Sequence, residues 1–206
     1  MLNKKAFTHS NIFIRITYAY SIYIMLVLLS FSIGYFLLPE GVLRSTPYAF
    51  WGEFVSRLEN PLEILFANVI INLAYVTVLG VGLNLQRVRS FPTGYIFLFA
   101  AGLVSGLFAG TNSFVVQAIS PYTIEGWIVA LKIQHLELLG YTVIIAATCN
   151  ISISDYSSWL PWKSKEIKIK RLRDIRLTKQ EVLGVIIGVL IILVAALNET
   201  LFGMAI

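Results

Sequence analysis

Long apolar runs separated by short polar segments dominate this chain. Each run approaches the 20 or so residues that a helix needs to cross the hydrocarbon core of a bilayer. The pattern therefore predicts an all-α fold, a polytopic membrane helix bundle in which residues 1–206 form a single transmembrane domain. About five transmembrane helices are expected, at about 12–38, 61–85, 92–110, 125–150 and 181–204.

The segment between the first two spans has a different pattern. Thr46 and Pro47 are typical of a helix start, and apolar residues follow at the i, i+3, i+4, i+7 spacing of one helix face. These apolar residues are Trp51, Phe54, Val55 and Leu58. We expect a short amphipathic helix on the membrane surface or across the end of the bundle. The uncharged segment 111–124 is either a compact loop or a short re-entrant piece.

Composition strengthens the membrane interpretation. The chain is 57% hydrophobic and only 13% charged, whereas about 25% of residues are charged in soluble domains. The net charge of +5 comes from cations beside the apolar runs, so the membrane explains it and nucleic acid is not an expected partner. The one cysteine, Cys149, lies in an apolar run and excludes an intramolecular disulfide.

The distribution of cations predicts the orientation. If the N-terminus is cytoplasmic, the three basic segments, namely the N-terminal residues up to Arg15, the pair Arg87 and Arg89, and the stretch 163–179, lie on one side. That side is the cytoplasm by the positive-inside rule. The sequence thus predicts a multi-pass protein of the cell membrane with an external C-terminus and a basic cytoplasmic loop at 151–180.

This basic loop is the main candidate contact surface. It carries eight Lys and Arg residues against three acidic residues, and the spacing of Leu172, Ile175, Lys179 and Val182 suggests a basic helix leading into the last span. Anionic lipid headgroups are the first expected partner, and an acidic soluble protein is the alternative. The candidate contacts are Lys168, Lys170, Arg171, Arg173 and Arg176.

Several polar residues interrupt the apolar spans. An ionisable group within hydrocarbon costs roughly 2.5–3.5 kcal/mol on insertion scales, so such groups face a protein interior, a partner or water. At about 1.5 Å per residue, Lys132 and Glu199 reach a similar depth and are expected to pair. The predicted outer-half polar cluster contains Lys132, His135, Glu199, Asn68 and Asn72, with Glu137 deeper and in a different interface.

Three interpretations of this cluster remain open. The groups can satisfy one another and fix the helix register, form a pathway for an ion, proton or substrate, or make a subunit contact. A separate packing signal lies in the third span, where Gly102, Gly106 and Gly110 stand four residues apart. Small residues at this spacing allow a neighbouring helix to approach closely.

Motifs of enzymes and metal sites are not found in this sequence. It has no Gly-x-Ser-x-Gly, no His-Glu-x-x-His and no phosphate-binding glycine loop, and its only histidines are His9 and His135. We therefore expect no catalytic residues, no metal and no cofactor.

Several segments carry a family resemblance. Leu65-Phe66-Ala67-Asn68 leads to Leu79-Gly80-Val81-Gly82, Thr93-Gly94 opens the next helix, His135-Leu136-Glu137 precedes an apolar run, and Val194-Ala195-Ala196-Leu197-Asn198-Glu199 comes near the end. Together, over about 61–206, these segments resemble the stage II sporulation protein M family of integral membrane proteins. His135 and Glu137 are two residues apart where that family has four, and Thr93 stands where it has asparagine.

The resemblance implies a multi-span, non-enzymatic protein. In spore formers the family's namesake anchors peptidoglycan-degrading partners during engulfment, and relatives occur in organisms that do not sporulate. The predicted function is an integral membrane scaffold or complex subunit that organises partner proteins, with a protein partner or a homo-oligomer expected. The alternative is a permease or channel-like transporter that uses the intramembrane polar cluster.

Overall fold

The computed structural model describes residues 4–46, 49–114, 120 and 122–204. The fold is mostly helical, and four helical segments in the described residues are long and apolar enough to cross a membrane. These are α2 (Ile12–Leu37), the continuous α4 (Pro61–Tyr75), η1 (Val76–Val81) and α5 (Gly82–Asn84), the pair α7 (Ile124–Lys132) and α8 (Gln134–Thr148), and α9 (Lys179–Met204).

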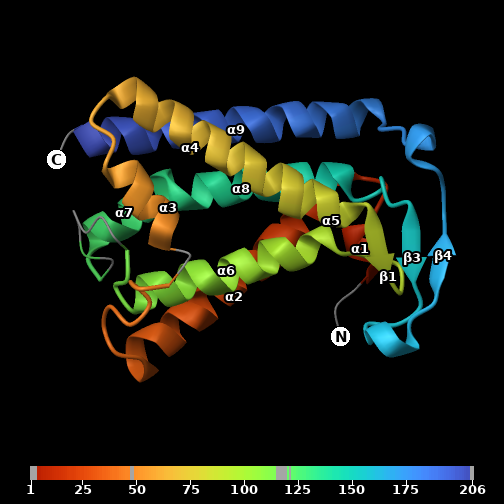
Figure 1. Ribbon diagram of the computed structural model, residues 1–206, viewed down its shortest axis with the longest axis horizontal. Helices are drawn as coiled ribbons and strands as arrows, with labels where there is room; N and C mark the ends of the chain where they lie inside the picture. The colour runs from red at the N-terminus through yellow and green to blue at the C-terminus, as the bar shows by residue number, and fades with distance from the viewer. Residues whose placement is uncertain (1–3, 47–48, 115–119, 121, 205–206) are drawn as a thin grey trace.

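The fifth apolar helix, α6 (Gly94–Gly110), is shorter. Its 17 residues extend about 26 Å at 1.5 Å per residue, against a hydrocarbon core of about 30 Å. Of the about five predicted spans, four are therefore confirmed as helices that are long and apolar enough to cross a membrane. In Figure 1, α6 nevertheless runs beside α2 along the bundle.

The bundle has two distinct ends (Figure 1). At the end that we call the sheet end lie α1 (Lys4–Phe7) and a small β-sheet, and at the opposite loop end lies α3 (Ala49–Ser56). The chain enters α2 from the sheet end, and the C-terminal helix α9 runs from the sheet end to the loop end. Helix α3 stands where the short amphipathic helix is expected, with Phe50 and Phe54 exposed. Pro47 and most of 115–121 lie outside the described residues.

A four-stranded sheet corrects the prediction of an all-α fold. Its strands are β1 (Gln86–Val88), β2 (Phe91–Pro92), β3 (Ser154–Tyr156) and β4 (Glu166–Lys168), in the order β2-β1-β3-β4. Strands β1 and β3 pair in parallel, and the other two pairs are antiparallel. The sheet joins two loops that are more than 60 residues apart, so only the folded bundle brings them together.

Local interactions explain two segments of this end of the fold, the hairpin between β1 and β2 and the segment before α9. Arg89 and Ser90 both adopt positive φ angles, 51° and 66°, as a tight two-residue hairpin turn requires. The backbone N–H of Ser90 donates to the Asp155 carboxylate at 3.1 Å. The predicted basic helix before the last span is wrong. Residues 172–178 instead form the short 3-10 helix η3 (Leu172–Asp174) and irregular backbone, because Thr178 caps α9 and the helix begins only at Lys179.

Glycines bring neighbouring helices into backbone contact. A Cβ atom on Gly106 would lie 2.1 Å from Ser30 Oγ and 2.3 Å from Val27 O, and one on Gly110 would lie 2.2 Å from Phe31 O. The glycines of α6 thus lie against the backbone of α2. Helices α8 and α9 meet in the same way, because a Cβ on Gly188 would lie 3.0 Å from Gly140 O. The remaining core consists of large buried side chains, among them Tyr23, Tyr95, Leu98, Ile145 and Ile192.

Candidate functional sites: two polar centres and a sheet edge

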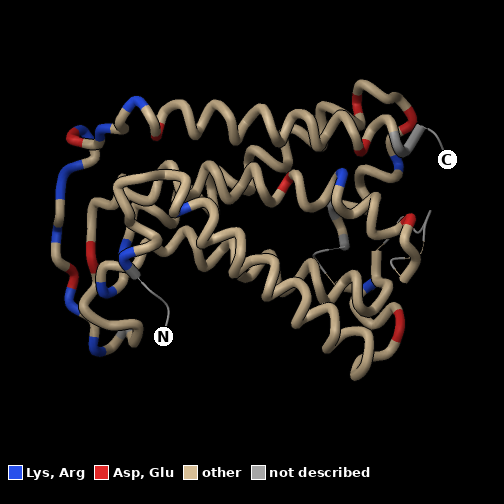
Figure 2. The backbone as a smooth tube through the Cα atoms, turned by 180° about the vertical axis from the view of Figure 1, so that it is seen from behind, with Lys and Arg blue, Asp and Glu red and all other residues tan. Residues whose placement is uncertain are grey.

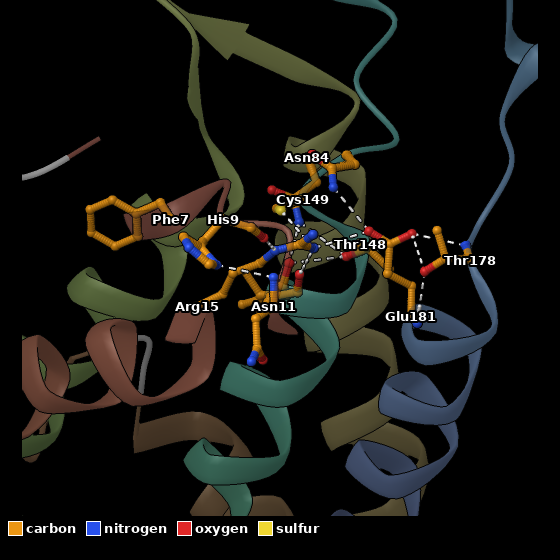
Figure 3. Close-up of polar contacts among 12 residues, drawn as sticks. Phe7, His9, Asn11, Arg15, Asn84, Thr148, Cys149, Thr178 and Glu181 are labelled. Atoms are coloured by element: carbon orange, nitrogen blue, oxygen red, sulfur yellow. Dashed lines mark hydrogen bonds and ion pairs between the residues drawn. The ribbon is translucent and has the colours of Figure 1, made fainter. Parts of the chain in front are cut away.

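A buried ion pair lies where the bundle meets the sheet (Figure 3). Arg15, in the first turn of α2, places Nη1 3.0 Å from Oε1 of Glu181, in the first turn of α9. Each residue is only 3% exposed. Two charges removed this completely from water are stable only when further hydrogen bonds satisfy them.

The carboxylate of Glu181 has such bonds. Thr178 donates to Oε2 through its backbone N–H at 2.9 Å and its hydroxyl at 3.1 Å, while the Glu181 N–H donates back to Thr178 Oγ1 at 3.3 Å. This reciprocal arrangement is a capping box at the start of α9. Asn150 Nδ2 adds a bond to Oε1 at 2.9 Å, so donors from three segments surround the carboxylate.

The C-terminus of α8 is the shared partner of this first centre. Carbonyl groups in the last turn of a helix lack partners within the helix. Cations are favourable there because the C-terminal end of the helix dipole carries partial negative charge. Four side chains from separate segments donate to these carbonyls: Asn84 to Ile145 at 2.9 Å, Arg15 to Ala146 at 3.0 Å, Arg87 to Cys149 at 3.1 Å and Lys170 to Asn150 at 2.7 Å. The end of α8 therefore fixes α2, α5, β1 and the basic loop together.

Sequence reasoning missed this ion pair although a signal was present. The depth comparison that matched Lys132 with Glu199 also applies to Arg15 and Glu181, each within four residues of the start of its span. The sequence predicts for Arg15 only a place on the cytoplasmic side, and the fold decides that it joins a buried ion pair.

The second centre, which we call the carboxyl centre, joins α4, α8 and α9. Asn72 Nδ2 donates to Oε1 of Glu137 at 2.6 Å, and the Tyr141 hydroxyl donates to Asn72 Oδ1. The carboxyl group of Glu199 on α9 is near enough to Glu137 to interact with it electrostatically. Neither carboxylate forms an ion pair with a cation in the part of the chain that the structure describes.

The structure divides the predicted polar cluster. Asn68 lies one turn from Asn72 on the same face of α4, buried, and its Nδ2 has no hydrogen-bond partner among the described residues. His135 is also buried but faces α2, with its ring centroid 6.0 Å from that of Tyr23. Glu137, expected in a different interface, is the group that interacts with Glu199.

Lys132 reaches the expected level but not the expected partner. Asn198 Nδ2 donates to the backbone oxygen of Lys132 at 2.9 Å, which places the fourth and fifth spans at one depth here. The Lys132 side chain is exposed, and the ion pairs of the described residues include none between it and Glu199. The prediction assumed one continuous helix, whereas the helix breaks at Ile133, with φ −115° and ψ −79°.

The third feature is the outer edge of β4, which pairs with no other strand in the part of the chain that the structure describes. Ser157 donates to Lys165 O at 3.1 Å and Ile169 donates to Ile153 O at 2.8 Å. The intervening Glu166 and Lys168 therefore occupy positions whose backbone N–H and C=O groups point away from β3. Figure 1 shows β4 as the strand farthest from the helices.

Cations gather at the same end, as Figure 2 shows. Of the predicted contact residues, Lys170 is half-buried because it binds Asn150 O, and Arg173 lies 3.8 Å from the Asp174 carboxylate. The members with exposed side chains are Lys168, Arg171, Arg173 and Arg176.

The geometry defines a helical protein of membrane type with a small sheet at one end. Comparisons with protein-family models, curated proteins and solved structures found no match. Among the described residues no group of three or more His, Cys, Asp or Glu residues is placed to hold a metal ion. Chemically, both charges of the ion-pair centre have further hydrogen-bond partners, which suits a structural role. The carboxyl centre can accept a proton or a cation.

Proposed function

We propose that this protein is an integral membrane scaffold or complex subunit, without enzymatic activity, that organises partner proteins at the membrane. The observation that carries the proposal is the outer, exposed edge of β4. An open strand edge offers unpaired N–H and C=O groups to another extended chain, and adding a strand to a sheet edge is a common mode of peptide recognition.

The charge of this edge selects the partner. Lys168, Arg171 and Arg173 are exposed on and beside β4, so an acidic extended segment of a soluble protein is the complementary partner. Exposed Ile167 and Ile169 supply apolar contacts next to the cations.

The position of β4 favours a soluble partner over the bilayer at this edge. Neighbouring strands lie about 4.8 Å apart, so β4 lies about 10 Å beyond β1, on the side away from the helices (Figure 1). Lipid headgroups meet the ends of the helices first, which leaves the outer edge of β4 facing water.

Charge and resemblance support the rest of the proposal. With the sheet end in the cytoplasm, all three basic segments obey the positive-inside rule, α6 makes a short fifth crossing and the C-terminus is external. The segments within 61–206 that resemble the stage II sporulation protein M family favour an anchoring role for partners, without implying sporulation.

A backbone substitution tests the proposal. Lys168→Pro removes the outward N–H of β4 but no ladder bond to β3, whereas the matched control Lys168→Gln removes only the charge. The protein is purified in mild detergent after crosslinking through a photoreactive residue at position 166. We expect a stoichiometric partner with the wild type and with Lys168→Gln and a loss of it with Lys168→Pro.

Two outcomes would contradict the proposal. If wild-type protein crosslinks to no stoichiometric partner, the scaffold function is wrong. If the partner remains with Lys168→Pro at the wild-type level, the edge of β4 is not the docking site.

A second function, a permease or channel-like transporter, is favoured by the carboxyl centre. Among the described residues, no cation forms an ion pair with Glu137 or Glu199, and the Nδ2 of buried Asn68 has no hydrogen-bond partner. Polar groups of this kind within a bilayer mark pathways for ions and protons. In proteoliposomes with a proton gradient, Glu137→Gln should reduce proton flux at least about tenfold. The control Glu125→Gln, which changes an exposed carboxylate, should leave proton flux unchanged. Wild-type vesicles without flux would exclude this function.

A further inference from the structure

A cavity of about 610 Å³ opens at the sheet end, beside the first turns of α2 and α9. Among the described residues, its lining includes Arg15, Lys170, Arg176 and Lys179, with Glu181 as the one carboxylate. The cavity is separate from the outer edge of β4, because no residue of β4 lines it.

The charge of the cavity is not balanced. The Glu181 carboxylate already receives bonds from Arg15, Asn150 and Thr178. Lys170 is held by Asn150 O at 2.7 Å, whereas Arg176 and Lys179 are exposed at the rim. The excess positive charge favours an anion with several acceptor oxygens, and phosphate groups meet this description.

The surroundings of the cavity indicate that the anion has an apolar tail. The cavity lies where the polar loop ends and the apolar helix α9 begins at Lys179. On α9, Leu183, Ile186 and Leu190 follow Lys179 on the same helix face, and all three are exposed. A ligand whose phosphate fills the cavity therefore has an apolar helix surface directly beside it.

We propose that this cavity binds the phosphate headgroup of an anionic phospholipid, whose acyl chains lie along that face of α9. Arg176 and Lys179 bind the phosphate, and the ion pair of Arg15 and Glu181 forms the floor of the site. Basic pockets beside membrane helices bind anionic headgroups in this manner. The site is independent of the scaffold function, because it requires no protein partner.

The experiment counts lipids bound to the full chain. The protein is incubated in non-ionic detergent with phosphatidylglycerol or phosphatidylcholine and examined by native mass spectrometry. The test variant is Arg176→Gln/Lys179→Gln, and the matched control is Lys168→Gln/Arg171→Gln, which removes the same charge from the same loop outside the cavity. Circular dichroism shows that each variant is folded, and the single variant Arg176→Gln replaces the double if the double is not.

We expect wild type and control to retain one phosphatidylglycerol more tightly than phosphatidylcholine. The test variant should bind phosphatidylglycerol about fivefold more weakly for each cation removed. Equal weakening in the control would overturn the proposal, because the attraction would then come from the charge of the whole loop. Displacement of the lipid by millimolar inorganic phosphate would also overturn it, because the site would then recognise the free anion.

Discussion

The buried pair of Arg15 and Glu181 yields the sharpest quantitative prediction. Glu181→Leu leaves the guanidinium of Arg15 without its charge partner in a site where Arg15 is 3% exposed. Arg15→Met likewise leaves the buried Glu181 carboxylate without its charge partner. Removing one member of a buried pair costs about 3–5 kcal/mol because the other charge stays buried without its counter-charge. Each single variant should therefore lose about 3–5 kcal/mol of the free energy of unfolding.

The double variant should be far more stable than the sum of the single changes. Arg15→Met/Glu181→Leu places two apolar side chains in the site and leaves no unpaired charge. It still loses the capping box with Thr178 and the bond to Ala146 O, each worth about 1 kcal/mol. We expect a loss of about 2 kcal/mol, instead of the roughly 6–10 kcal/mol that additivity predicts.

The assay is reversible unfolding in mixed micelles with increasing dodecyl sulfate, followed by circular dichroism. The control is Glu53→Gln, which breaks the exposed pair of Glu53 and Arg57 and should cost less than about 1 kcal/mol. Additive single effects, within about 0.5 kcal/mol, would refute the coupling between Arg15 and Glu181.

Three further predictions follow from packing and topology. Gly106→Ala should destabilise the protein by about 1–3 kcal/mol, because its Cβ would lie 2.1 Å from Ser30 Oγ. The control Gly82→Ala should change thermal stability little, because its Cβ would come only within 3.6 Å of Thr77 O. Equal losses in the two variants would contradict the packing of α6 on α2. Cys149 is buried and should react with maleimide far more slowly than a cysteine introduced at exposed Ile167; comparable rates in detergent would show that the end of α8 opens. In intact cells of a variant that lacks Cys149, an impermeant maleimide should label a cysteine at Val42 but not one at Ile167; the reverse pattern would invert the proposed orientation.

Local pattern was sufficient for the helices. Apolar runs predicted the four long spans, and these appear as helices with bounds close to the expected ranges. The glycine spacing of Gly102, Gly106 and Gly110 identified a face of α6 that lies against α2. Both signals are periodic within one segment, so they can be read without knowledge of any neighbour.

Pairing across the fold was not predictable in the same way. Strands β1 and β3 have three residues each, too few for an alternating pattern, and they form because the ends of α5 and α8 lie together. The depth comparison placed Lys132 level with Glu199, yet it gave no direction around the helix axis. The helix breaks at Ile133, and the Lys132 side chain is exposed.

Sequence alone thus determined which segments of this protein are helical and apolar enough for a membrane, because burial in hydrocarbon demands long runs that satisfy their own backbone bonds. Tertiary structure decided which polar groups meet: Arg15 with Glu181, Glu137 with Asn72, and the basic loop with the hairpin at 86–92. Such contacts depend on the rotation and tilt of each helix against its neighbours, and close packing at glycines sets these angles over the whole bundle.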